Sequence, residues 1–304
     1  MSDALGCIEA GGTKFVCGVV AGGEAPQNVM RIETTSPDET LRRVSDYFRS
    51  RQAAGDRLSA FGIASFGPVE VDPASPRWGS ILQTPKPGWS HVALASAVAR
   101  TFGAPVGFDT DVNAAALAEA AHEDVAGHDL TYVTVGTGIG GGSVVNGAPL
   151  HGARHPEMGH IHPPRHPLDH AFQGCCPFHG ACLEGLASGP AIEARWGRTL
   201  SELPAEHEAH EIIAWYLAHL TVTIAAVLAP HRIVLGGGVM QAPALLDRVK
   251  HHADGLGGDY FGGPLSECLG APRTGDNPGL RGAAILARRA LESSTTAQTR
   301  IASG

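Results

Sequence analysis

Three residues with metal-binding side chains stand at close, regular spacing in the sequence. They form the motif Cys176-x-x-His179-x-x-Cys182. Thiolate and imidazole suit tetrahedral Zn²⁺, which needs a fourth ligand here, and His160 is our candidate. Four protein ligands leave no open position on the metal, so we expect a structural zinc, with free thiols and no metal as the alternative. Other ligand choices stay open: Cys175 in place of Cys176, and His162, His166 or His170 in place of His160.

Two glycine turns could hold phosphate. Gly136-x-Gly138-x-x-Gly141 matches a dinucleotide fingerprint only as a bare pattern, because the residues after it are β-branched and end in the hairpin signal Asn146–Gly147 rather than opening a helix. The run Gly11–Lys14 lacks the spacing of a P-loop. Both turns offer backbone N–H groups and a threonine hydroxyl, which can cradle phosphate oxygens, although ordinary glycine hairpins would look the same. The two turns are about 124 residues apart, which suggests two similar half-chains that together bind one polyphosphate.

Four further polar residues could act on an alcohol. Asp111 follows a predicted strand and precedes an alanine-rich helix, where a carboxylate could accept a hydroxyl proton or simply cap the helix. Glu157, His160 and Glu184 lie beside apolar sequence. Such groups could accept hydrogen bonds from sugar hydroxyls, and surface charge is the alternative for them.

The elements that must position these residues follow from the apolar pattern. Strands and helices alternate with glycine turns, which is typical of an α/β protein. Strands are expected at residues 7–20 (two strands), 58–65, 106–108, 131–135 with a partner strand after the glycine turn, and 232–235. Helices are expected at 38–54, 92–102, 114–122, 183–196, 207–229 and 281–292, with a disordered tail from Ser293. The Pro/Gly-rich loop 66–89 is long, and its two tryptophans argue against disorder.

Composition and charge narrow the function classes. The chain has 304 residues with a formal net charge of −8, which argues against a nucleic-acid-binding protein. We find neither an apolar run of the roughly 18 residues that a membrane helix needs nor the pattern of a signal peptide, so we expect a cytoplasmic protein without a membrane anchor. Six cysteines are too few for a disulfide scaffold.

Eight short motifs occur in one order along the chain, and together they resemble the ROK family (repressors, open reading frames and sugar kinases). Within that family they resemble the zinc-containing fructokinase branch, and the resemblance runs from about Gly6 to Ala290. The motifs are Glu9–Lys14, Ser65–Pro68, Thr84–Trp89, Asp111–Asn113, Gly136–Gly142, His155–His160, Cys176–Gly185 and Leu235–Gly238.

The resemblance implies a fold and an oligomeric state. It implies a two-domain actin-like (ribonuclease-H-like) α/β sugar-kinase fold with an inter-domain cleft. We expect a smaller domain from residues 1–111 with 283–304, and a larger one from 112–282 that carries the zinc-binding loop 151–184. Members of this family are commonly homodimers, so a homodimer is expected.

The resemblance also implies site residues. Asp111 would be the general base, and Mg²⁺ would accompany ATP. The expected ATP-binding residues are Gly11, Gly12, Thr13, Lys14, Thr137, Gly138, Gly236, Gly237 and Gly238. The expected sugar-binding residues are Glu157, His160, Glu184, Gly67 and Thr110. The expected zinc ligands are His160, Cys176, His179 and Cys182.

Two residues depart from the usual family pattern. Glu9 stands where the family opening has Asp, although the fructokinase branch shares the Glu, so the group that assists Mg²⁺ is not fixed by the pattern. Thr110 stands where many sugar kinases have Asn, and its single hydroxyl offers fewer hydrogen bonds to a sugar.

The activity implied is ATP-dependent phosphorylation of fructose to fructose 6-phosphate (ATP:D-fructose 6-phosphotransferase). The loop Thr84–Trp89 resembles that of the fructokinase branch, and this resemblance favours fructose as the substrate. The alternatives are a kinase for another hexose (mannose, glucose or an N-acetylhexosamine) and a non-enzymatic sugar-binding regulator, which would need a helix-turn-helix ahead of the first strand.

Overall fold

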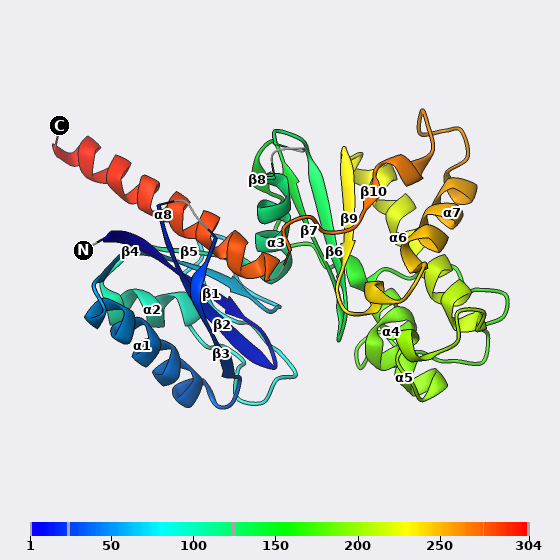
Figure 1. The fold of residues 1–304 in the computed structure, drawn as a ribbon, viewed down its shortest axis with the longest axis horizontal. Helices are drawn as coiled ribbons and strands as arrows, with labels where there is room; N and C mark the ends of the chain where they lie inside the picture. The colour runs from blue at the N-terminus through cyan, green and yellow to red at the C-terminus, as the bar shows by residue number, and fades with distance from the viewer. Residues whose placement is uncertain (1, 23–24, 123–125, 276, 303–304) are drawn as a thin grey trace. The chain divides into compact units, whose positions relative to one another are not determined.

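The computed structural model describes residues 2–22, 25–122, 126–275 and 277–302 (Figure 1). The chain forms two compact units. Unit 1 comprises Met1–Ala118, Leu150–His155 and Thr274–Gly304, and unit 2 comprises Glu119–Pro149 and Pro156–Arg273. The domain boundaries expected from the sequence, at 111/112 and 282/283, stay a prediction.

Unit 1 is built on a five-stranded mixed sheet. Its strands lie in the order β3-β2-β1-β4-β5. β1 to β3 form an antiparallel meander, and β4 and β5 continue the sheet parallel to β1. The strands are β1 (Ser2–Ala10), β2 (Lys14–Ala21), β3 (Gln27–Glu33), β4 (Asp56–Ser65) and β5 (Val106–Thr110). The strands expected from the sequence here are confirmed.

Helices cover both faces of this sheet, and glycine decides how closely they approach. On one face, α1 (Pro37–Ala53) and α2 (Leu94–Phe102) pack on aromatic side chains, with the Phe48 and Phe61 rings 5.0 Å apart. On the other face, α8 (Pro278–Ala302) lies directly on the strands, where a Cβ at Gly62 would stand 1.7 Å from the Ala283 carbonyl oxygen. Because neighbouring strand residues point to opposite faces, this alternation of Phe and Gly sets one thick and one thin layer.

The long loop 66–89 is ordered by its aromatic anchor, as expected. Trp89 is fully buried, its Nε1 donates to the Thr35 carbonyl oxygen at 2.8 Å, and its ring centroid lies 5.2 Å from that of Phe15. The loop is thereby fixed to the sheet of unit 1.

The disordered tail expected from Ser293 is wrong for the part of the tail that the structure describes. Helix α8 continues to Ala302, and residues 303 and 304 lie outside the described residues. The hydroxyls of Ser293 and Thr296 donate to the carbonyls of Arg289 and Glu292 at 2.8 and 2.9 Å. These side chains bond to the preceding turn, so a weak helix-forming sequence extends a helix that already exists.

Unit 2 repeats the same strand order. Its sheet has the order β10-β9-β6-β7-β8, in which β6 to β8 form an antiparallel meander and β9 and β10 continue parallel to β6. The strands are β6 (Leu130–Val135), β7 (Ile139–Val145), β8 (Ala148–Pro149), β9 (Arg232–Gly236) and β10 (Leu269–Gly270). The two similar half-chains inferred from the glycine turns are therefore present as two sheets of one topology.

The helices of unit 2 pack around a large apolar core. They are α4 (Leu183–Ala187), α5 (Gly189–Trp196), α6 (Glu208–Leu228) and α7 (Leu245–Gly257). A single helix over 183–196 was expected, and this is wrong. Ser188 has extended backbone and accepts a hydrogen bond from the Ala191 N–H, so it ends α4 and caps α5.

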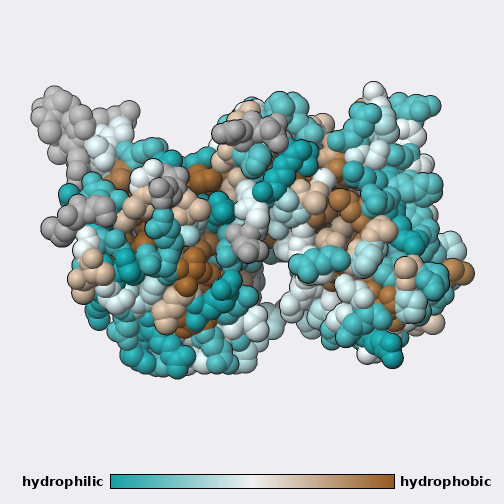
Figure 2. All heavy atoms as spheres, viewed as in Figure 1, coloured by the Kyte–Doolittle hydropathy of each residue, from teal (hydrophilic) through white to brown (hydrophobic). Residues whose placement is uncertain are grey.

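Helix α6 is long and apolar enough to cross a membrane by length and composition. Its 18-residue window has a mean hydropathy of 1.7, although polar residues such as His219, Thr221 and Thr223 interrupt the apolar run. More than half of that window, 56%, is buried inside the protein, as in the core helix of a globular domain. Figure 2 shows a largely hydrophilic face on which hydrophobic residues gather only in small groups.

Candidate functional site

The corner between β5 and α3 (Asp111–Ala120) positions the candidate base. The Thr110 hydroxyl accepts the Asn113 N–H at 3.0 Å, which is the hydrogen bond of a helix cap. Asp111, the first residue of α3, is partly exposed, and its Oδ1 accepts the Val112 N–H at 2.9 Å. Thr110 is therefore the helix cap, and the partly exposed Asp111 is not needed for that role.

The first glycine turn, also in unit 1, is held through its carbonyl groups. The Thr34 hydroxyl donates to the Gly11 carbonyl at 2.8 Å, and the Thr34 N–H donates to the Thr13 carbonyl at 2.9 Å. Gly12 has open space on its Cα, and Thr13 and Lys14 are exposed. This arrangement leaves the surface of the turn accessible to an anion.

Glu9 is bound to the start of a helix, which the sequence did not indicate. A Cβ on Gly279 would lie 2.8 Å from the Glu9 Cδ, so the carboxyl group stands at the N-terminus of α8. Burial raises the pKa of Glu9, and a hydrogen bond from the Leu280 N–H together with the charges of Lys14 and Arg31 opposes that rise. A carboxylate at a helix N-terminus is favoured by the unpaired N–H groups there.

The second glycine turn joins β6 to β7 in unit 2. The register Val135↔Ile139 shows strand-turn-strand geometry, so the interpretation against a dinucleotide site is confirmed. Glu184 accepts the Ile139 N–H through Oε2 at 2.9 Å, and a Cβ on Gly138 would stand 2.7 Å from that oxygen. Gly138 therefore allows the Glu184 carboxylate to reach the turn.

The third glycine turn follows β9 and lies beside the second. Thr134 pairs with Gly236 in the parallel ladder. Gly237 has a φ of 94°, and a Cβ there would come within 2.4 Å of the Val135 carbonyl oxygen. Within unit 2 the structure thus brings Thr137 and Gly138 close to Gly236–Gly238.

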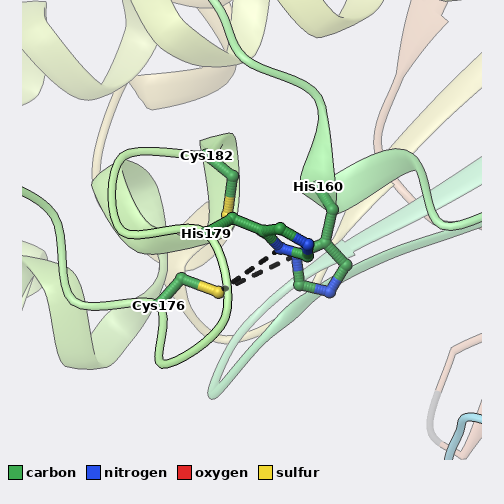
Figure 3. Close-up of side chains that lie close together, drawn as sticks. All are labelled: His160, Cys176, His179 and Cys182. Atoms are coloured by element: carbon green, nitrogen blue, oxygen red, sulfur yellow. Dashed lines mark hydrogen bonds between the residues drawn. The ribbon is translucent and has the colours of Figure 1, made fainter.

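A group of four thiol and imidazole ligands is gathered in unit 2 (Figure 3). One ligand atom from each of these side chains lies within 4.8 Å of the other three. Cys176 and Cys182 are buried, His160 is half-buried and His179 is exposed. Burial raises the pKa of the Cys182 thiol to about 11. A bound dication acts in the opposite direction, because it favours the thiolate.

The distances within this group fit a tetrahedral metal. Ordinary zinc bonds place two nitrogens about 3.3 Å apart, and a nitrogen and a sulfur about 3.6 Å apart. The Nδ1 atoms of His160 and His179 are 3.3 Å apart, and His160 Nδ1 lies 3.5 Å from Cys182 Sγ. Cys176 Sγ lies 3.8 Å from His179 Nδ1 and 4.0 Å from His160 Nδ1. These four residues could therefore hold Zn²⁺.

The other candidate ligands do not belong to the four-residue group, although the ring centroid of His162 lies 6.3 Å from that of His179. Cys175 is exposed and does not belong to the four-residue group. The His166 ring packs edge-on against Trp215, 5.5 Å between centroids. Of the alternatives that the sequence left open, the described geometry favours Cys176 and His160.

Two further sugar-binding candidates, Glu157 and His160, lie between β8 and Cys176. Met158–His160 forms a short 3₁₀ helix, η2, and Glu157 before it is exposed. A Cβ on Gly159 would stand 1.8 Å from the Ile139 carbonyl oxygen, so this helix lies against the start of β7. His160 points its Nδ1 at the ligand group.

The candidate residues divide between the two units. Gly11–Lys14, Gly67, Thr110 and Asp111 belong to unit 1, and the remaining ATP, sugar and metal candidates belong to unit 2. Sequence reasoning missed the polar cluster of Asp109, Asn113 and His151, whose first two members stand on either side of Thr110 and Asp111 in the sequence. The Asp109/Asn113 spacing of four residues was a usable signal, because such residues lie close together when one ends a strand and the other begins a helix.

Comparison with known proteins agrees with this architecture. The chain is 48% identical to the fructokinase of Zymomonas mobilis over 93% of this chain and 95% of that protein. It is 45% identical to a putative fructokinase of Bacillus subtilis over 95% and 96% of the two chains. The crystal structure of a ROK hexokinase from Thermus thermophilus superposes with a TM-score of 0.78 at 27% identity, covering 95% of this chain and 99% of that one.

These similarities establish the fold and the family. The two α/β units with one shared strand order form the actin-like fold of the ROK sugar kinases, as expected from the sequence. The ROK family model matches residues 5–290. The chain is therefore a member of the ROK family.

Proposed function

We propose that this protein is an ATP-dependent fructokinase that converts fructose to fructose 6-phosphate. The observation that carries the proposal is the 48% identity to the Zymomonas mobilis fructokinase over 93% of the chain. The four-residue thiol and imidazole group supports it, because the zinc-containing branch that the sequence resembles needs such a group.

Asp111 is the general base in this proposal. Its carboxylate accepts the proton of the fructose 6-hydroxyl as that oxygen attacks the γ-phosphorus of ATP, and ADP leaves with the electrons of the broken bond. The Thr110 cap and the start of α3 fix the position of the Asp111 backbone. The magnesium ion that accompanies ATP offsets the charge of the phosphates.

The ATP phosphates are bound by the glycine turns. Thr13, Lys14 and Thr137 are exposed on these turns and supply hydroxyl and ammonium donors. The glycines have no side chain that would block an approaching phosphate, although the Gly11 N–H already donates to the Lys14 carbonyl oxygen at 3.0 Å. The turn residues concerned are Gly11, Gly12, Gly138, Gly236, Gly237 and Gly238.

Fructose is held by side chains whose other atoms are already engaged. Glu184 uses Oε2 for the Ile139 N–H, so Oε1 is the oxygen offered to the sugar. His160 directs Nδ1 at the zinc group, so Nε2 is the atom offered to the sugar. Glu157, Thr110 and Gly67 complete the set.

Zinc has a structural role in this proposal. When bound, it holds His160, Cys176, His179 and Cys182 in one closed site and so fixes the loop that carries Glu157 and His160. Four protein ligands leave no coordination position open at which the metal could activate a substrate.

The setting of the enzyme is part of the proposal. We place it in the cytoplasm as a homodimer, acting on small molecules rather than nucleic acid or membranes. The net charge of −8 supports a protein that does not act on nucleic acid, because negative charge disfavours binding to polyanions.

The test is ADP release by purified protein with MgATP and, in turn, fructose, mannose, glucose and N-acetylglucosamine. We expect fructose to give the highest kcat/KM. A higher value for another hexose would keep the kinase and replace the substrate. No turnover with any of the four sugars, in folded protein that contains zinc, would support the sugar-binding regulator instead.

A further inference from the structure

A short segment of the chain, Leu150–His155, belongs to unit 1 although the residues on both sides of it belong to unit 2. We call this segment the strap. It begins after β8 and runs on to Glu157 and His160. Two histidines on it, His151 and His155, bond to other parts of unit 1, and neither has a role in the proposed site.

His151 is bonded to a buried carboxylate. Its Nε2 lies 3.1 Å from Asp109 Oδ2 and 3.2 Å from Oδ1, and the Asp109 side chain is only 3% exposed. The same Oδ1 accepts the Thr110 N–H and the Asn113 Nδ2, both at 2.7 Å. One carboxylate thus ties together the end of β5, the first turn of α3 and the strap.

His155 is bonded to backbone rather than to a charge. Its Nε2 accepts the Val69 N–H at 3.1 Å, and the residue is 9% exposed. Val69 stands two residues after Gly67, the glycine of unit 1 that is expected near the sugar. The strap is therefore bonded to the rest of unit 1 at two places, and each lies next to a candidate site residue in the sequence.

We propose that His151 is a positioning residue for phosphoryl transfer, acting through Asp109 to hold the β5–α3 corner that carries Thr110 and Asp111. The proposal rests on the proposed function of Asp111. Asp109 stands two residues before the base and receives donors from β5, α3 and the strap. Loss of one donor leaves a buried carboxylate partly unpaired, and the corner can relieve this by shifting. A shift of about 1 Å at a reacting group can lower a rate by roughly 10²-fold.

The pair also gives the corner a dependence on pH. The groups that face the His151 ring are the Asp109 carboxylate on β5 and the neutral Asn113 amide on α3. The hydrogen bond to Asp109 raises the pKa of His151, and partial burial opposes that rise. A group whose pKa is raised by folding stabilises the native pair below its unfolded value and loses this contribution as the pH rises through the folded value. We therefore expect the pair to weaken toward alkaline pH.

Kinetics of two variants test the positioning role. In His151→Ala we expect kcat/KM for fructose to fall by about 10-fold, whereas His151→Gln, whose amide can still donate to Asp109, should restore it to within about 3-fold. We expect kcat/KM of the wild type to fall toward alkaline pH and this fall to be absent in His151→Gln. His251→Gln, at an exposed position on α7, is the matched control and should keep the wild-type profile. An unchanged profile in His151→Gln, or equal losses in the Ala and Gln variants, would overturn the proposal.

NMR titration of the histidine rings tests the pair without any activity. We expect the His151 ring to titrate at lower pH in Asp109→Asn than in the wild type, because the hydrogen bond to Asp109 raises the pKa of His151. A His151 titration that is the same in Asp109→Asn and in wild type would overturn the pair. Failure of the wild type to phosphorylate fructose would instead overturn the proposed function, and the titration would still decide the pair.

Discussion

The two units share one strand order but hold their functional residues in different ways. In unit 1 the candidate residues stand at ends of regular elements, where Thr110 caps α3 and Gly11 is fixed by Thr34. In unit 2, between β8 and α4, the chain forms one 3₁₀ helix and otherwise no regular element that would position Glu157. In the proposed function, zinc bound by the thiol and imidazole group would order this segment in place of secondary structure.

The difference lies in the crossover between the third and fourth strand of each sheet. In unit 1 this crossover is little more than α1. Between β8 and β9 it runs from Leu150 to His231 and carries the strap, the four-residue thiol and imidazole group, and α4 to α6. The proposed sugar-binding loop therefore has no counterpart in the crossover of the first sheet.

The largest effect is expected from Asp111→Asn in unit 1. The variant keeps the shape of the side chain and removes its ability to accept a proton, so kcat should fall by roughly 10²- to 10⁴-fold. Binding of ATP and fructose, measured by calorimetry, should change by no more than about 3-fold. Asp46→Asn, on the exposed face of α1, is the control. A kcat close to wild type in Asp111→Asn would remove this residue from the mechanism.

Breaking the metal group should have the next largest effect, and neighbouring cysteines supply a matched pair. Cys176→Ser should lose bound zinc and raise the KM for fructose by about 10- to 100-fold, because the sugar-binding loop loses its fixed shape. Cys175→Ser changes an exposed thiol outside the group and should keep both properties. Zinc content per chain and steady-state kinetics measure this. Loss of zinc in Cys175→Ser with retention in Cys176→Ser would reverse the ligand assignment.

A moderate effect is expected where the second glycine turn meets Glu184. In Gly138→Ala the new Cβ would stand 2.7 Å from Glu184 Oε2, so the carboxylate must move away from the turn. We expect kcat/KM for fructose to fall by about 10-fold, in line with the displacement of one hydrogen-bonded group. Gly136→Ala meets no heavy atom within 4 Å and should cost less. Equal losses in the two variants would show that steric contact with Glu184 is not the cause.

The smallest effect is expected at the end of α8. Ending the chain after Glu292 removes Ser293, Thr295 and Thr296, three exposed residues whose hydroxyls donate to carbonyl oxygens of the preceding helical turn. The melting temperature should fall by no more than about 2 °C, since few buried contacts are lost. Thermal unfolding measures this, and a drop several times larger would show that the tail packs against the protein.

Local patterns predicted the central strands of both sheets but missed the edge strands β3, β8 and β10 and helix α7, and the reasons for the failures are physical. The β6–β7 turn could be told from a dinucleotide site because Ser143–Val145 and Asn146–Gly147 favour a hairpin. The break at Ser188 was missed because the apolar periodicity continues across one serine and one proline, and this pattern predicts a single uninterrupted helix. The α8 tail was missed because a helix extends more easily than it begins.

Among the site residues, those at short spacing could be predicted and those at long range could not. Cys176, His179 and Cys182 stand within one loop, so their spacing indicates the metal. The bond between His151 and Asp109 joins residues 42 positions apart, and only the fold brings them together. The sequence left the role of Glu9 open, and its contact with the N-terminus of α8 could not be predicted because it depends on a helix far along the chain.

The most direct measurement is the identity of the product formed from fructose and MgATP, read by ³¹P NMR of the reaction mixture. The account predicts a single new phosphomonoester, fructose 6-phosphate, formed in step with ADP by the wild type and lacking in Asp111→Asn. Phosphate released to water, a phosphoryl group on another hydroxyl of fructose, or the same product from Asp111→Asn would contradict it.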